Sequence, residues 1–120
     1  MANVVVAPVA EADIESILAW TQEQFGDEAR LRYAAILSQS LLDIAENPHL
    51  TGSTSRSEVA SNVRTYHISN SRNHVDEAIG RVKKPRHVVL YRIAANTVQI
   101  GRVLHDSMDL PRHLPENYRA

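Results

Sequence analysis

Charged and imidazole side chains crowd into the last fifth of this 120-residue sequence. An imidazole can exchange a proton near neutral pH, and a guanidinium can hold a phosphate or carboxylate. The set could therefore support acid–base chemistry on a phosphodiester, or bind a partner. Arg102 and His105 stand at the end of an apolar segment, and Asp106, Asp109, Arg112 and His113 follow it. Polar groups gathered at the end of a rigid element usually form a contact surface.

Three of these residues have a spacing that could hold a metal ion. His105, Asp109 and His113 would share one face of a helix, but Pro111 falls between the last two and argues against that helix. The sequence has no H-x-x-x-H pair and no cysteine, which excludes disulfides, thiolate nucleophiles and cysteine-ligated zinc. We therefore expect no metal site and no cofactor. His105 is expected instead to donate a hydrogen bond that fixes the tail, with His113 exposed.

The apolar segment before the tail predicts a β-hairpin. Residues 87–93 and 97–105 are rich in Val, Ile, Leu and Tyr, and Ala95-Asn96 between them can form a tight turn because Asn tolerates a left-handed backbone. Tyr91 and Arg92 are expected to be core and sheet-edge residues. The hairpin would place Arg102 and His105 on its second strand.

Two helices are predicted in the first half of the chain. The first spans about 11–24 and ends at Gly26; Asp27 can cap the second, which stops before Pro48. The short connection predicts an antiparallel helical hairpin. Apolar residues repeat with the helical period, at Ile14, Ile17, Leu18 and Phe25 in the first helix and at Tyr33, Ile36, Leu37, Leu41 and Ile44 in the second.

The apolar face of this hairpin needs a sheet to cover it. Residues 4–7 and 63–69 can supply two more strands, so we predict one α+β domain over residues 1–120 with a mainly antiparallel sheet. Residues 49–61 are expected to form an exposed connection. The polar stretch 70–84 is longer than a usual connection, and a helical turn is predicted within it at residues 75–79.

Charge is distributed unevenly along the chain, although the net charge is only −1. Residues 1–47 carry two basic and eight acidic side chains, or −6, and the remainder carries eleven basic and six acidic, or +5. Such asymmetry can orient a partner, although an acidic solvated helix face would also produce it.

No apolar run approaches the length of a membrane span and no secretion signal precedes the first strand, so a cytoplasmic location without membrane attachment is expected.

The pattern from Tyr91-Arg92 through I-x-R-V-L-H-x-x-M-D-x-x-R-H-L resembles the ParE branch of the ParE/RelE toxin superfamily of type II toxin–antitoxin modules. The order of strand, two helices and hairpin resembles that branch over nearly the whole chain. The resemblance implies a non-enzymatic toxin that poisons DNA gyrase and is neutralised by a ParD-type antitoxin, which folds on binding. The residues expected to form or support the toxic surface are Arg102, His105, Met108, Asp109, Arg112 and His113.

Structural roles are the alternatives for some of these residues. Arg102 and Asp109 could instead form an ion pair that pins the tail to the sheet. Trp20 lies off the apolar stripe of the first helix, so it is predicted to anchor the antitoxin, with a core position as the alternative. The tail has few apolar residues, and removing residues 109–120 is therefore expected to reduce toxicity more than stability.

A ribosome-dependent mRNA interferase of the RelE type is the enzymatic alternative. Those ribonucleases use three functional residues, two Arg and a Tyr. The resemblance places these near Val88, Met108 and Leu114 of this sequence, which are apolar. Arg102 with His105 could still provide acid–base chemistry, and His67 could replace a lysine.

A nucleic-acid-binding module is the third possibility. The basic residues between 81 and 86 could contact phosphates, but five Tyr and Phe in total and a pI of about 6.6 give little support for a base-stacking platform. No direct sequence-specific nucleic-acid binding is expected.

Overall fold

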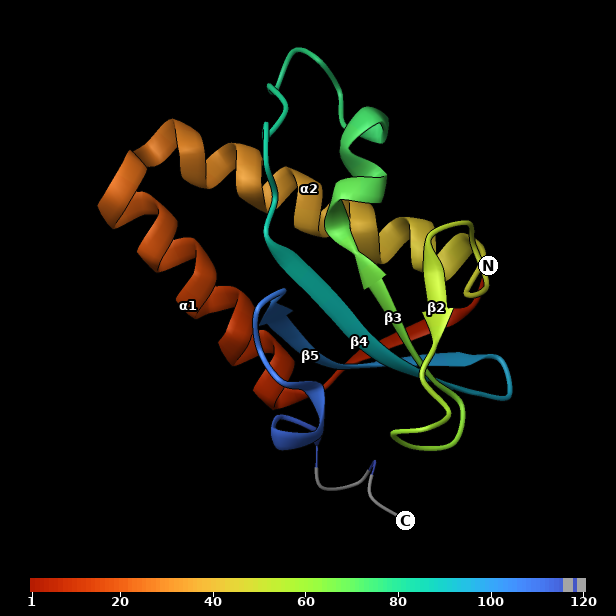
Figure 1. The fold of residues 1–120 in the computed structure, drawn as a ribbon. Coiled ribbons are helices and arrows are strands. Elements are labelled where there is room, and N and C mark those ends of the chain that lie inside the picture. Colours follow the sequence, from red (N-terminus) through yellow and green to blue (C-terminus); the bar gives the residue numbers. More distant parts are fainter. Residues whose placement is uncertain (116–117, 119–120) are drawn as a thin grey trace.

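The computed structural model describes residues 1–115 and 118, which form an α+β domain (Figure 1). The strands form a single sheet of order β1-β5-β4-β3-β2, in which β1 runs parallel to β5 and the other neighbours are antiparallel. The predicted fold class is confirmed. The elements are β1 (Asn3–Val6), α1 (Pro8–Phe25), α2 (Asp27–Glu46), β2 (Ser53–Ser55), β3 (Val63–His67), the 3-10 helix η1 (Ile68–His74), β4 (His87–Ala94), β5 (Thr97–His105) and the 3-10 helix η2 (Leu110–Arg112).

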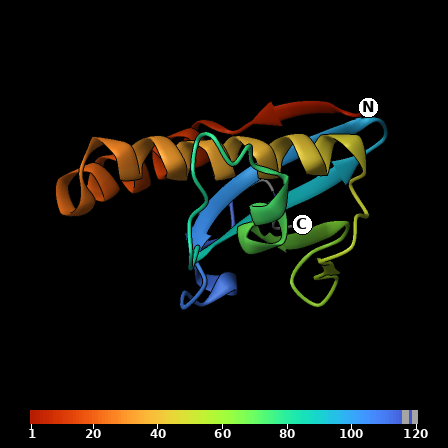
Figure 2. The ribbon, with the colours of Figure 1, turned by 90° about the horizontal axis from the view of Figure 1, so that it is seen from above.

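The helices form the predicted hairpin and cover one face of the sheet (Figures 1 and 2). Their apolar stripes pack on alternate residues of the strands because successive strand side chains point to opposite faces. This main core contains Ile36 and Ile44 of α2 against Val89, Tyr91 and Ile100 of the sheet, all at most 1% exposed. None of the helices in the described part of the chain is long and apolar enough to cross a membrane.

The helix ends follow their sequence signals with two differences. α1 begins three residues earlier than predicted, at Pro8, because proline is favoured in a first turn that needs no N–H partner. Gly26 separates the helices with a φ of 92°, a conformation that glycine adopts without strain. Asp27 is the first residue of α2 and not its cap; its carboxylate accepts a hydrogen bond from Gln22 of α1.

The predicted β4–β5 hairpin is confirmed. The left-handed residue in its turn is Ala95, with a φ of 54°, and not Asn96. A β-bulge interrupts the pairing, since Leu90 lies opposite Arg102 and Tyr91 opposite Ile100. The extra residue is Gly101, where a Cβ would lie 2.7 Å from the Tyr118 ring. The bulge therefore leaves room for an aromatic side chain over β5.

Three segments differ from the sequence predictions. Residues 49–61 contain the short edge strand β2, which polar Ser and Thr residues did not signal. β3 ends at His67, where the 3-10 helix η1 begins. The helical turn predicted at 75–79 is present one residue later, at 76–80. The 3-10 helix η1 before it was not predicted; Ser71 and His74 hold it to Asp43 of α2 at 2.6 and 2.7 Å.

The tail forms a second, smaller core on the face of the sheet away from the helices. Tyr118 is 1% exposed and packs with Val63 and Leu90, with Leu110 and Leu114 beside them. The Tyr118 hydroxyl donates to the Gln99 carbonyl, and the Arg92 guanidinium lies 4.8 Å from the centre of its ring. The tail therefore stabilises the domain, which changes the expected effect of deleting it.

Tyr91 of β4 is a core residue, as predicted. Arg92 was predicted at a sheet edge, but β4 lies between β5 and β3, so Arg92 is not on an edge strand.

Candidate functional site

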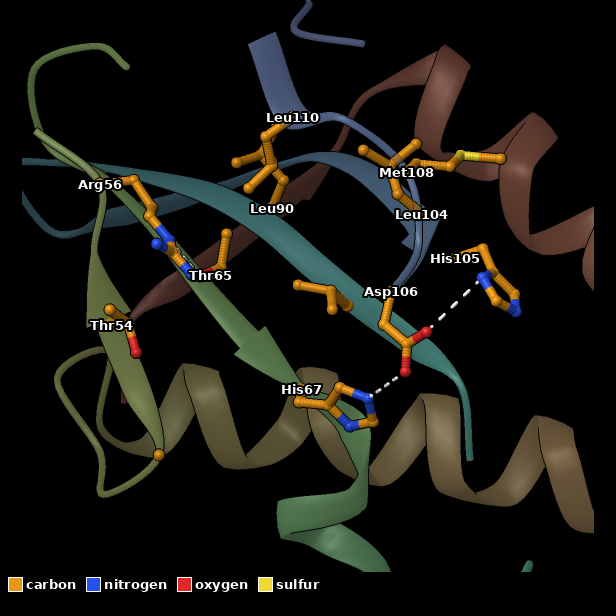
Figure 3. Close-up of a pocket in the computed structure, with 12 residues that line it drawn as sticks. Thr54, Arg56, Thr65, His67, Leu90, Leu104, His105, Asp106, Met108 and Leu110 are labelled. Atoms are coloured by element: carbon orange, nitrogen blue, oxygen red, sulfur yellow. Dashed lines mark hydrogen bonds and ion pairs between the residues drawn. The ribbon is translucent and has the colours of Figure 1, made fainter. Parts of the chain in front are cut away.

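A pocket of about 290 Å³ opens on the face of the sheet that the helices leave uncovered (Figure 3). We call it the sheet pocket. Its apolar lining is Val88, Leu90, Leu104, Met108 and Leu110, and its polar lining is Gly52, Thr54, Arg56, Thr65, His67, His105 and Asp106. Strands β2 to β5 and the start of the tail thus build it together, from segments about 50 residues apart in the sequence.

Asp106 is the centre of the charged cluster at one end of this pocket. Its carboxylate accepts hydrogen bonds from both the Nε and Nη2 of Arg86, at 3.0 to 3.2 Å. His67 Nδ1 accepts the Ser69 backbone N–H, so the proton of a neutral His67 lies on Nε2, which donates to Asp106 at 3.0 Å. The hydrogen bonds from Arg86, followed by those from His67, hold the pKa of Asp106 far below its usual range.

His87 links this cluster to the helices. Tyr33 of α2 accepts the Arg86 backbone N–H and donates its own proton to His87 Nδ1. The His87 ring then meets the His105 ring edge to face, with centroids 5.5 Å apart. Burial, and then repulsion by His105, lowers the pKa of His87 to about 4, so this imidazole is neutral at physiological pH.

The lowered pKa of His87 predicts a pH dependence of stability. The unfolded imidazole takes up a proton below its ordinary pKa of 6.5, whereas the folded one does so only near 4, so stability should fall as the pH decreases through that window. Allowing for solvent screening at a half-buried ring, we expect a loss of about 1 kcal/mol between pH 7 and pH 5 in urea unfolding.

His87→Asn should remove most of this slope, since its amide oxygen can take the place of Nδ1 as acceptor. His49→Asn, the same exchange at an exposed position, controls for the effect of introducing an asparagine. Equal slopes for His87→Asn and the wild type would show that His87 is not the titrating group. Asp106 does not contribute in this window, because a lowered carboxylate pKa costs stability only below the ordinary pKa of about 4.

Arg102 is a structural residue. Its Nε and Nη2 donate to the Asp13 carboxylate of α1 at 2.8 and 2.9 Å, and the backbone N–H of Val103 donates to the same carboxylate at 2.9 Å. Its Nη1 donates to the His113 carbonyl at 3.1 Å, which ties the tail to β5. The Arg102–Asp109 ion pair, which was the structural alternative to target contact, is therefore wrong. Arg102 does pin the tail, but through a backbone carbonyl and with a helix residue as its charge partner.

The two tail histidines differ from their predicted roles. His105 Nδ1 accepts the Ser107 backbone N–H at 3.2 Å, so His105 fixes the start of the tail as an acceptor and not as a donor. His113 is half-buried and contributes its carbonyl to Arg102. Across residues 1–115 and 118, no group of three His, Asp or Glu side chains could hold a metal ion, which includes the set of His105, Asp109 and His113.

Three of the predicted contact residues lie on the surface of the tail. Met108 is 47% exposed and lines the sheet pocket. Asp109 and Arg112 form an exposed ion pair at 3.4 Å across the 3-10 helix η2. A pair so open to solvent contributes little to stability. Of the six predicted target-contact residues, these three are therefore the most accessible to a partner.

The sequence matches a profile described as "ParE toxin of type II toxin-antitoxin system, parDE" over residues 4–110. The chain belongs to the ParE toxin family. A solved structure described as "Chromosomal ParDE TA system from P. aeruginosa" has the same fold, with a TM-score of 0.64 at 16% identity over 88% of this chain and 96% of that chain. A search of curated proteins by sequence found no match.

In this ParE toxin, the three apolar residues that the sequence places near functional positions of the ribonuclease branch lie close together. Val88 and Met108 line the sheet pocket, and Leu114 packs in the smaller core beside it. Trp20 is 55% exposed on α1, where its ring meets Phe25 edge to face at 5.8 Å. This position fits the predicted interface role of Trp20 and excludes the core alternative.

Sequence reasoning missed Tyr33, Arg86 and His87 as parts of this ParE site. Arg86 was read only as one member of a basic run, and Tyr33 only as a core residue of α2. No local spacing could have found the cluster, because Arg86 and Asp106 are 20 residues apart and Tyr33 and His87 are 54 apart. The available signal was topological, since the start of β4 and the end of β5 must meet in an antiparallel hairpin.

Proposed function

We propose that this ParE toxin acts in the cytoplasm by binding DNA gyrase, catalyses no reaction itself, and is neutralised by a ParD-type antitoxin. One observation supports the non-enzymatic mechanism most directly. The sheet pocket, which holds Val88 and Met108, two of the three positions compared with ribonuclease residues, is lined on its apolar side by Val88, Leu90 and Leu104 together with Met108 and Leu110. These side chains offer no charge to a phosphodiester.

The cations near the sheet pocket are already engaged. The Arg56 Nε donates to Thr65, its Nη1 lies 3.8 Å from Glu58, and Arg86 is bound on two nitrogens by Asp106. Cleavage of RNA needs cations that can neutralise the charge developing on the phosphate. Arg102 with His105 does not provide this chemistry either, because Arg102 is held by Asp13.

The exposed tail is a better surface for a protein target. Met108 presents an adaptable apolar side chain, and Asp109 and Arg112 present one charge of each sign beside it. An apolar centre with a polar rim is the usual composition of a protein–protein contact. We therefore assign target contact to Met108, Asp109 and Arg112, supported from behind by Arg102, His105 and His113.

Expression in bacteria tests the proposal. The chain alone should arrest growth, and co-expression with the product of the adjacent small reading frame should restore it. The purified toxin should inhibit supercoiling by gyrase and should leave ribosome-bound message intact. Codon-specific cuts in mRNA during arrest would favour the ribonuclease alternative, with His67 and His105 at the pocket edge as the acid–base candidates. Unaffected growth would contradict both.

Variants of the tail surface should separate target contact from folding. The double variant Met108→Ala/Arg112→Ala should reduce gyrase inhibition by at least tenfold while changing the free energy of unfolding by no more than about 0.5 kcal/mol, because both side chains are exposed. Leu42→Ala on α2 is the control, since Leu42 is also a surface apolar residue, at 43% exposure. A double variant with wild-type inhibition would place the target surface elsewhere.

A further inference from the structure

A second cavity, which we call the hairpin groove, lies between the tip of the helical hairpin and the segment that enters β4. Its volume is about 780 Å³, against about 290 Å³ for the sheet pocket. Both helices contribute side chains to its lining, and residues 81–84 contribute from the segment that leads into β4. His105 lines both cavities, so the groove ends behind the Asp106 cluster.

The floor of the hairpin groove is apolar and open to solvent. Trp20 and Phe25 are 55% and 68% exposed and pack against each other, with Tyr33 and Val82 beside them. Two large aromatic side chains left in water at one place are typical of an interaction site, because burying them against a partner releases a large apolar area. The Trp20–Phe25 pair is thus a preformed seat for an apolar anchor.

The rim of the groove is cationic. It carries Arg32, Arg81, Lys83, Lys84 and Arg86. Three of these cations have acidic partners: Glu28 for Arg32 at 3.9 Å, Glu77 for Arg81 at 3.1 Å and Asp106 for Arg86 at 3.0 Å.

Lys83 and Lys84 are exposed, and neither forms an ion pair within residues 1–115 and 118. The rim therefore has a surplus of two positive charges that an acidic partner could neutralise. The helices beside the rim belong to the acidic part of the sequence, residues 1–47, which would repel an acidic partner. Such a partner is therefore expected to bind at the two lysines.

The rim is held in place by the segment that the sequence showed as an unusually long connection. Arg81 donates to the backbone carbonyls of Val75 and Asn73, and Arg72 donates to the carbonyl of Val82. Gly80 has a φ of 95°, and a Cβ there would lie 2.7 Å from the Arg32 side chain, so the segment packs directly on α2. Because the backbone of the rim is already fixed, binding a partner there loses little conformational entropy.

From these features we propose that the hairpin groove binds an acidic segment of the antitoxin that carries an apolar anchor side chain, and that Lys83 and Lys84 help select that antitoxin. This inference rests on the proposed neutralisation by an antitoxin and adds the binding surface and the chemistry of the bound segment. The anchor packs on Trp20 and Phe25, and its neighbouring carboxylates meet the two lysines. Complementary charges of this kind set specificity and association rate.

A single-stranded nucleic acid would also meet aromatic rings and cations here, but the geometry favours a peptide. The Trp20 and Phe25 rings stand at 76° to each other, so they do not offer the two successive parallel faces on which bases stack. The surplus of two charges is also small for a polyanion.

Trp20 provides a direct readout because it is the only tryptophan in the chain. The purified product of the adjacent reading frame should shift its emission to shorter wavelength and protect it from acrylamide quenching. Trp20→Phe toxin provides the subtraction for any tryptophan of the antitoxin itself. An emission spectrum and quenching constant unchanged by saturating antitoxin would overturn the proposal.

Charge reversal tests the lysines. Lys83→Glu/Lys84→Glu should raise the Kd for the antitoxin by at least tenfold, and the difference should shrink as salt is added. Lys84→Glu and Arg112→Glu change the net charge equally, yet only the first should weaken binding, since Arg112 lies on the tail. Equal Kd values for these two variants would overturn the proposal.

Three outcomes distinguish this inference from its alternatives. Displacement of the antitoxin by a single-stranded oligonucleotide, with the oligonucleotide itself shifting Trp20 emission, would overturn the proposal in favour of nucleic acid. A wild-type toxin that binds no antitoxin would overturn this inference together with the proposed function. Tight binding that leaves Trp20 exposed would overturn the inference alone and leave the proposed function intact.

Discussion

Replacing Tyr118 with alanine should lower the free energy of unfolding by about 3–5 kcal/mol, the usual cost of removing a buried aromatic ring. The ring is 1% exposed and covers Val63, Leu90 and the bulge at Gly101, and its hydroxyl donates to the Gln99 carbonyl. Urea unfolding followed by circular dichroism measures this effect. A small domain typically has a total stability of 5–15 kcal/mol, so the variant should be marginal.

Tyr118→Phe is the matched control, because it keeps the ring and removes only the hydrogen bond to Gln99. It should cost about 1–2 kcal/mol. A loss below about 1 kcal/mol for Tyr118→Ala would show that the tail is not part of the core. Deletion of residues 109–120 removes Leu110 and Leu114 as well, so it should destabilise the domain further and does not isolate toxicity from folding.

Arg102→Ala should destabilise the protein by about 3 kcal/mol. The Arg102 and Asp13 side chains are only 21% and 15% exposed, so removing the guanidinium leaves a largely buried carboxylate without its charge partner. The same change removes the donor to the His113 carbonyl and releases the tail from β5. Under the proposed function, gyrase inhibition should fall together with stability, because Arg102 supports the tail surface from behind.

Arg112→Ala is the control for this variant, since its pair with Asp109 is exposed and should contribute less than about 0.5 kcal/mol. The double variant Asp13→Ala/Arg102→Ala should cost less than the sum of the two single changes, because neither charge is then left alone. Additive losses would mean that the two side chains are not coupled. An Arg102→Ala protein of wild-type stability would contradict the structural role altogether.

The sequence by itself determined the parts of this protein that depend on local chemistry. Alternating and branched apolar residues on both sides of Ala95-Asn96 predicted the β4–β5 hairpin to within a residue or two, because a strand is recognised by its two-residue period. The helical stripe around Ile36 and Ile44 predicted α2 in the same way. Family membership followed from the order of these elements, which no single motif carried.

Only the tertiary structure decided which charged groups meet. The sequence left open an Arg102–Asp109 ion pair, between residues seven positions apart, as the alternative to target contact, but the partner of Arg102 is Asp13, 89 residues away on α1. Spacing along the chain does not indicate which acidic residue pairs with Arg102. In the fold, Asp13 is favoured because its carboxylate also accepts the backbone N–H of Val103 in β5, which would otherwise lack a partner. The tail was predicted to be polar and to contribute little to the core. In the structure, Gly101 has no Cβ, which leaves room for the Tyr118 ring to pack on the sheet and form a second core. The sequence determines the chemistry of each side chain. The packing of the helices, sheet and tail determines which side chains come into contact.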